Sequence, residues 1–137
     1  MNHVVLFDMD GTLTRTRKEM DVEMVKTISS LSRKVKIGIV TGSGYSYVEE
    51  QCKRLWDEII PVNLANLSLL PCNGTQKYDW TGSRWKRNFY LDMIKELGEE
   101  NYRNLICSII NNQSDLIKDK RFCDIPLIGH SISYRES

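Results

Sequence analysis

The sequence predicts an α/β protein built on a doubly wound parallel sheet. Short apolar runs alternate with segments of helical periodicity, which is the pattern of parallel strands joined by crossover helices. Polar residues follow the carboxyl ends of those runs, where such sheets bind their ligands. The 137 residues carry a net charge of +1, with 41% hydrophobic and 27% charged residues, as in ordinary soluble globular proteins. This balance argues against a nucleic acid or an anionic membrane as partner.

The first half of the chain reads as strand, helix, strand, helix, strand. Residues 4–7 form an apolar run typical of a strand buried on both faces. Asp21 is a good N-cap for a helix over residues 21 to 33, and a strand rich in β-branched residues follows at 35–40. A single apolar stripe predicts the next helix, which stops near Pro61, and a short strand covers residues 67–70; the stripe consists of Val48, Cys52, Leu55 and Ile59.

The pattern changes from about residue 76. Tyr78 and Trp80 alternate with polar residues before a Thr-Gly-Ser turn, which predicts a β-hairpin whose aromatic side chains pack within it; a stacking platform is the alternative. Helical segments at 91–97 and 102–110, separated by Gly98, precede a polar loop to Asp124 and a strand at 128–135. We place the domain boundary near residue 86, which gives a core at 1–86 and a second domain at 87–137.

Two carboxylates stand one residue apart at the end of the first strand. Like charges this close, next to a hydrophobic strand, cost stability unless a cation or a chemical task retains them. Asp8 is placed to attack a phosphoryl phosphorus, and Asp10 to protonate the leaving oxygen. Mg²⁺ held by these acids would offset the repulsion between an anionic nucleophile and an anionic substrate.

The neighbouring turns supply donors for phosphate oxygens. Gly11 and Thr12 free backbone N–H groups, and Thr41, with Ser43 as the adjacent candidate, adds a hydroxyl and an amide at the next strand end. The alternative is that Thr41-Gly42-Ser43 forms only a strand-to-helix turn. The four cysteines show no metal-ligand spacing, which indicates small buried or half-buried thiols. Without a signal peptide at the start of the sequence, we expect a cytoplasmic location.

The motif DMDGTLT, followed one βα unit later by IVTG, resembles the haloacid dehalogenase-like superfamily. Within it, the similarity to eukaryotic-type phosphomannomutases runs through FDMDGTLTRTR, IGIVTGSGYSYVEEQ, PCNGTQKY, LGEENYRNLI and GHSISYR. The resemblance implies a Rossmann-like core with an inserted α/β cap, Mg²⁺ dependence, and interconversion of mannose 6-phosphate and mannose 1-phosphate. It adds Arg17, Gly42 and the cap residue Arg135 to the candidate phosphate contacts, and it leaves a homodimer through the cap open.

The sequence departs from the mutase pattern at Thr41, Gly44 and Cys72. The superfamily's third and fourth motifs also have no matching residues, so we expect both the core and the cap to be incomplete in this chain. A sugar-phosphate phosphatase of the same superfamily and a non-catalytic truncated remnant therefore stay open as alternatives. A receiver-like phosphoacceptor is disfavoured by the D-x-D-G-T-L-T motif.

Overall fold

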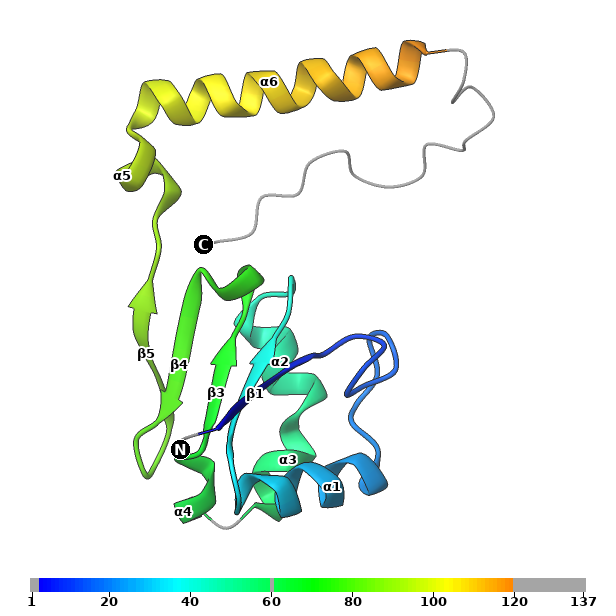
Figure 1. The fold of residues 1–137 in the computed structure, drawn as a ribbon, viewed down its shortest axis with the longest axis vertical. Helices are drawn as coiled ribbons and strands as arrows, with labels where there is room; N and C mark the ends of the chain where they lie inside the picture. The colour runs from blue at the N-terminus through cyan, green and yellow to red at the C-terminus, as the bar shows by residue number, and fades with distance from the viewer. Residues whose placement is uncertain (1–2, 60, 120–137) are drawn as a thin grey trace. The chain divides into compact units, whose positions relative to one another are not determined.

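A computed structural model describes residues 3–59 and 61–119 of the chain (Figure 1). Within them a single sheet has the order β1-β2-β3-β4-β5. The parallel strands are β1 (Val4–Asp8), β2 (Lys36–Val40) and β3 (Leu67–Leu70). The hairpin strands β4 (Gln76–Trp80) and β5 (Trp85–Tyr90) continue the sheet in antiparallel fashion. The predicted α/β class is confirmed, and the predicted hairpin makes the sheet mixed rather than purely parallel.

The first crossover helix, α1, spans Val22–Ser32 and confirms the prediction for residues 21 to 33. Its N-cap is Asp21, whose carboxylate accepts a hydrogen bond of 2.8 Å from the Met24 N–H. This bond satisfies one of the backbone donors that a helix leaves open at its start. Val25 and Ile28 lie on the buried side of the helix.

The second predicted helix is two helices, α2 (Tyr45–Gln51) and α3 (Lys53–Glu58), so the expectation of one continuous element was wrong. The backbone leaves helical geometry at Cys52, with φ −100° and ψ 7°, and the Leu55 N–H bonds to the Cys52 carbonyl at 2.8 Å. The apolar stripe continues across the break, which is why the pattern read as one helix. A short helix, α4 (Pro61–Leu64), completes the segment before β3.

The core lies between one face of the sheet and these helices. Alternate strand residues, among them Ile37, Ile39, Leu67 and Leu69, join the buried side chains of the helices in a single cluster. On the opposite face of β1, Val4 and Leu6 are 58% and 62% exposed. Strands that follow in sequence order place right-handed crossovers on the same face of the sheet. The prediction that β1 is buried on both faces is therefore wrong for this chain.

Gly38 in β2 lies beneath two leucine side chains of the opposite face. A Cβ at this position would stand 2.5 Å from Leu6 Cδ2 and 3.2 Å from Leu70 Cδ1. The close approach explains why a strand interior that favours β-branched residues holds glycine here.

The aromatic residues of the hairpin pack against one another, as predicted, and also against the helices, which the sequence did not indicate. The Trp80 and Trp85 rings lie 5.4 Å apart edge to face, and Trp56 of α3 lies 5.0 Å from Trp85. Tyr78 stacks on Tyr45 of α2 with ring centroids 4.2 Å apart. These contacts fasten the hairpin to the helical layer.

A second compact unit begins at Asp92, whereas the first reaches Leu91. It contains α5 (Met93–Leu97) and α6 (Glu99–Lys118), separated by Gly98 with φ +77°. The loop expected from residue 111 is helical up to Lys118, because polar residues without glycine or proline do not end a helix. The strand predicted at 128–135 lies outside the described residues. That the two units are a core and a cap stays a prediction.

Candidate functional site

The last residues of the three parallel strands stand level across the sheet. Asp8 is opposite Val40 in the register of β1 and β2, and Val40 is opposite Leu70 in that of β2 and β3. The segments that follow these residues therefore leave the same edge of the sheet (Figure 1). Most of the predicted site residues belong to the first two of these segments.

The turn after β1 is wound around one carbonyl group. Met9 is fully buried, and its carbonyl oxygen accepts hydrogen bonds from the N–H groups of Thr12, Leu13 and Thr14 at 3.3, 3.0 and 2.9 Å. The Gly11 N–H donates to the Thr14 carbonyl at 2.7 Å. Gly11 has φ +80°, a backbone conformation that costs little only for glycine. The N–H groups of Gly11 and Thr12 are therefore bonded within the turn, and the expectation that the turn leaves them free for phosphate oxygens is wrong for this structure.

The two acids have different surroundings. The Asp8 side chain is exposed and makes no hydrogen bond or ion pair with another residue that the structure describes. The half-buried Asp10 accepts a hydrogen bond of 3.0 Å at Oδ1 from the Arg17 N–H. Asp8 is therefore open to a reactant, whereas Asp10 is held in orientation by its own loop.

Arg17 contributes to this arrangement through its backbone. It has φ +55°, which is uncommon for a residue with a side chain, and this conformation turns its N–H toward Asp10. Its guanidinium lies over the ring of Tyr47 in α2, 5.1 Å from the centroid. The resemblance implied a phosphate contact for Arg17, and this role stays a prediction. Tyr47 was not singled out from the sequence.

The Thr41–Ser43 segment supplies fewer free donors than we expected. Thr41 is 3% exposed, and its amide donates to the Leu70 carbonyl at 3.2 Å. Its hydroxyl oxygen accepts the Ser43 N–H at 3.1 Å, so these atoms also make the turn that was the alternative interpretation. The hydroxyl proton of Thr41 can still be donated. Gly42 and Ser43 are half-buried.

The segment after β3 has three consecutive residues with positive φ. The values are +51° at Cys72, +57° at Asn73 and +83° at Gly74, within the 3₁₀ turn η1 (Cys72–Gly74). The Cys72 N–H donates to the Ser43 carbonyl at 3.0 Å, and the Asn73 N–H to the Thr41 carbonyl at 2.8 Å. Strained backbone of this kind concentrates at functional sites. The Asn-Gly pair was the sequence signal for it.

Gln51 contacts the loop that carries Asp10 and was missed by the sequence analysis. It lies at the end of α2, is 3% exposed, and accepts a hydrogen bond of 2.9 Å at Oε1 from the Thr14 hydroxyl. Its position, three residues after Val48 and next to Cys52, belongs to the buried side of the helix. A polar residue within an apolar stripe was the signal that could have found it.

Burial determines the ionisation of the thiol beneath the site. Desolvation, with a smaller contribution from the charge of Asp10, raises the pKa of Cys52 from 9.0 to about 12. The thiol is therefore neutral at physiological pH and is a packing group rather than a nucleophile. The prediction of small buried or half-buried thiols is confirmed for Cys52 and Cys72 and is wrong for Cys107, which is exposed, whereas Cys123 lies outside the described residues.

The acids offer oxygen ligands suited to Mg²⁺. Within the described residues no group of three or more His, Cys, Asp or Glu side chains gathers. Mg²⁺ commonly takes one or two carboxylates and fills its remaining positions with water and substrate phosphate. Asp8 has no side-chain partner among the residues that the structure describes, and Asp10 uses Oδ1 for Arg17, so both carboxylates fit such a metal. Arg135, the remaining predicted contact, lies outside the described residues.

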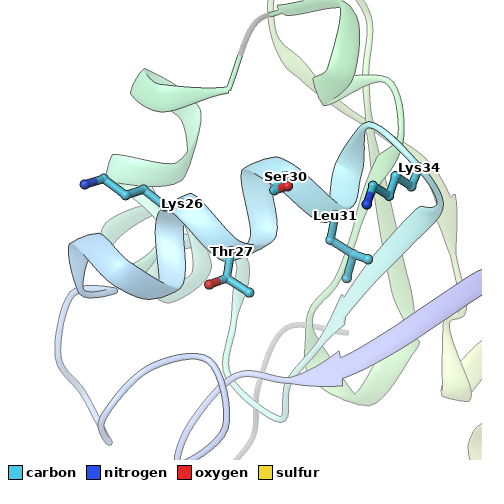
Figure 2. Close-up of a pocket in the computed structure, with 5 residues that line it drawn as sticks. All are labelled: Lys26, Thr27, Ser30, Leu31 and Lys34. Atoms are coloured by element: carbon cyan, nitrogen blue, oxygen red, sulfur yellow. The ribbon is translucent and has the colours of Figure 1, made fainter.

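A shallow hollow on the first unit lies along α1, away from these acids. It is lined by Lys26, Thr27, Ser30, Leu31 and Lys34, which Figure 2 draws along the second half of the helix and the turn after it. This turn leads into the start of β2, which pairs with the start of β1, whereas Asp8 lies at the other end of β1. None of the predicted site residues lines the hollow. In addition, no described helix is both long and apolar enough to cross a membrane.

Comparison with known proteins gives a family match and a set of related sequences. The model of the haloacid dehalogenase-like hydrolases matches residues 5–117. A phosphomannomutase of Encephalitozoon cuniculi is 33% identical in an alignment that covers 98% of this chain and 46% of that protein. Phosphomannomutase 2 of Dictyostelium discoideum is 32% identical, with 92% and 44% covered. The chain thus spans less than half the length of these relatives.

Solved structures resemble the fold at low sequence identity. An IMP-bound mutant of the Plasmodium falciparum IMP-nucleotidase superposes with a TM-score of 0.65 at 15% identity, over 86% of this chain and 34% of that one. A haloacid dehalogenase-like hydrolase from Bacteroides thetaiotaomicron gives 0.53 at 16% identity, over 75% and 36%. At this level of identity the likeness concerns the fold alone.

Proposed function

The chain belongs to the haloacid dehalogenase-like hydrolase family, and on this premise we propose that it carries the nucleophile and the acid/base of a phosphoryl transfer. The observation that carries the proposal is the pair at the end of β1. Asp8 is exposed and unpaired among the described residues, and Asp10 is fixed beside it by the Arg17 N–H at 3.0 Å. An enzyme that transfers or hydrolyses phosphate is the class that both the family and its relatives support.

In the first step a carboxylate oxygen of Asp8 attacks the phosphorus of a phosphate monoester. A bond forms between Asp8 and phosphorus, the bond from phosphorus to the substrate oxygen breaks, and protonated Asp10 gives its proton to that oxygen. In the second step a hydroxyl group attacks the aspartyl phosphate, Asp10 takes the hydroxyl proton, and the bond between phosphorus and Asp8 breaks. Mg²⁺ held by Asp8 would offset the repulsion between carboxylate and phosphate, and Asp10 would keep its free oxygen for the proton.

The curated relatives favour a hexose phosphate as substrate, and we propose interconversion of mannose 6-phosphate and mannose 1-phosphate. In a mutase the attacking hydroxyl belongs to the sugar, whereas in a phosphatase it belongs to water. Phosphatase activity is the second candidate, because the family model that matches the chain is that of the haloacid dehalogenase-like hydrolases.

The test is incubation of the chain with Mg²⁺ and mannose 1-phosphate. Mannose 6-phosphate without free phosphate supports the mutase, and free phosphate supports the phosphatase. Asp8→Asn should abolish both products, because an amide cannot be the nucleophile. Asp57→Asn, at an exposed position of α3, is the matched control and should keep them. The proposal would be contradicted if the wild-type chain formed neither product and if no acyl phosphate could be trapped on it.

A further inference from the structure

The loop that carries Asp10 is attached to one residue of α2 at two points. The Thr14 hydroxyl lies 2.9 Å from Gln51 Oε1, and the Met20 N–H donates to the Gln51 carbonyl at 2.8 Å. Thr14 and Gln51 are 5% and 3% exposed, so water does not compete for their hydrogen bond. The segment from Met9 to Met20 is thereby attached to the helix at Thr14 and at Met20.

Thr14 is the residue through which this attachment reaches Asp10. Its carbonyl accepts the Gly11 N–H at 2.7 Å, and its own N–H and hydroxyl lie 2.9 and 3.2 Å from the Met9 carbonyl oxygen. Asp10 is enclosed between Met9 and Gly11, so a displacement of Thr14 would move both of its neighbours. The bond from the Arg17 N–H to Asp10 then depends on the same loop.

Packing alone does not call for glutamine at position 51. The Nε2 atom of Gln51 is buried and finds no acceptor among the described residues. The Thr14 hydroxyl has a single proton for two oxygen neighbours, so the pair is short of hydrogen bonds in this orientation of the carboxamide. A leucine of similar size would avoid this cost of burial. The polar residue therefore points to a task other than stability.

We propose that Thr14 and Gln51 are positioning residues that hold Asp10 at the angle needed to protonate the leaving oxygen. The inference rests on the proposed function, because it assigns Asp10 the acid role in phosphoryl transfer. It predicts a particular chemical signature. A poor leaving group, such as an alkyl alcohol, needs the proton, whereas 2,4-dinitrophenolate departs without it.

The first experiment compares two substrates in the full chain with Mg²⁺. The quantity compared is kcat/KM, because it reports the step in which the leaving group departs and excludes the later hydrolysis of the aspartyl phosphate. Thr14→Val and Gln51→Leu should lower kcat/KM for an alkyl phosphate by about 10- to 100-fold and kcat/KM for 2,4-dinitrophenyl phosphate by less than about threefold. Thr14→Ser keeps the hydroxyl and should restore the alkyl activity. Equal losses on both substrates would overturn the positioning role, because they would indicate general damage to the fold.

The second experiment does not require turnover. Hydrogen exchange measured by NMR should show the Arg17 amide exchanging at least about tenfold faster in Thr14→Val and Gln51→Leu than in wild type. The Val25 amide, which bonds to the Asp21 carbonyl at 3.0 Å within α1, should be unchanged. Ser32→Ala, a buried polar change at the far end of α1, is the control that should leave Arg17 as in wild type.

The two experiments separate the inference from the proposed function. If wild type hydrolyses neither substrate while the Arg17 amide responds as stated, the proposed function fails for this chain and the attachment of the loop stands. If the Arg17 amide is unchanged in both variants, or changes together with Val25, the positioning inference is overturned whatever the activity.

Discussion

Replacement of Gly11 by alanine should cost little stability but should disturb the acid at the site. Nothing lies within 4 Å of the place where the new Cβ would stand, so no steric clash contributes. The remaining cost is that of an L-residue at φ +80°, about 1–2 kcal/mol. Alanine also reduces the freedom of the unfolded chain, which offsets about 0.4–1 kcal/mol. We therefore expect the free energy of unfolding to fall by about 1 kcal/mol.

Gly82 offers a matched control in the β-hairpin. It has φ +96° and equally open space around a Cβ, but it lies in the turn between β4 and β5. Gly82→Ala should therefore lose a similar free energy of unfolding in urea. Only in Gly11→Ala would relaxation of the strained φ also turn the N–H away from the Thr14 carbonyl and shift Asp10.

The assay combines urea unfolding with hydrolysis of an alkyl phosphate. A misplacement of about 1 Å at a reacting group can cost about 100-fold, so we expect a loss of at least tenfold for Gly11→Ala and less than about twofold for Gly82→Ala. A fall in stability above about 3 kcal/mol, or equal activity losses in both variants, would refute the reasoning. The first result would mean that contacts rather than backbone strain govern the turn.

Three further changes test other parts of the structure. Asp21→Ala removes the N-cap of α1 and should lower the free energy of unfolding by about 1 kcal/mol; an unchanged urea midpoint would show that the cap contributes nothing. The folded state retains the proton of Cys52 up to a pKa of about 12, above the ordinary 9.0, so stability should fall as pH rises between these values. Cys52→Ala should make the fall in the free energy of unfolding with pH less steep. The same steepness in both proteins would contradict the raised pKa of Cys52. The exposed Val4 and Leu6 predict that the chain self-associates, and Leu6→Lys, which places a charge on this face of β1, should reduce that association in sedimentation velocity. A monomeric wild type, or equal association of the two proteins, would contradict the prediction.

The regular elements could be predicted because each has a local cause. The Asp21 cap, the β-branched run of β2 and the turn before β5 involve residues close together in sequence, and the structure confirms all three. The break at Cys52 could not be predicted, since an apolar stripe continues across it. The exposed face of β1 could not be predicted either. An apolar run shows that both faces of a strand can be buried, but it does not show whether helices cover both faces.

The candidate site also has features that local sequence predicts and features that it does not. Asp8 and Asp10 could be proposed as site residues because their chemistry follows from residue type and from the strand before them, whereas the attachments that orient Asp10 join distant segments. The hydrogen bond between Thr14 and Gln51 spans 37 residues of sequence, and no periodicity or turn signal links its ends. A buried polar side chain on an apolar helix face is a local anomaly, however, and its physical cost is what marks it. Gln51 is such a residue. A buried glutamine at a position where leucine would pack without this cost indicates a role other than packing, and here we propose that this role is to hold the loop of Asp10.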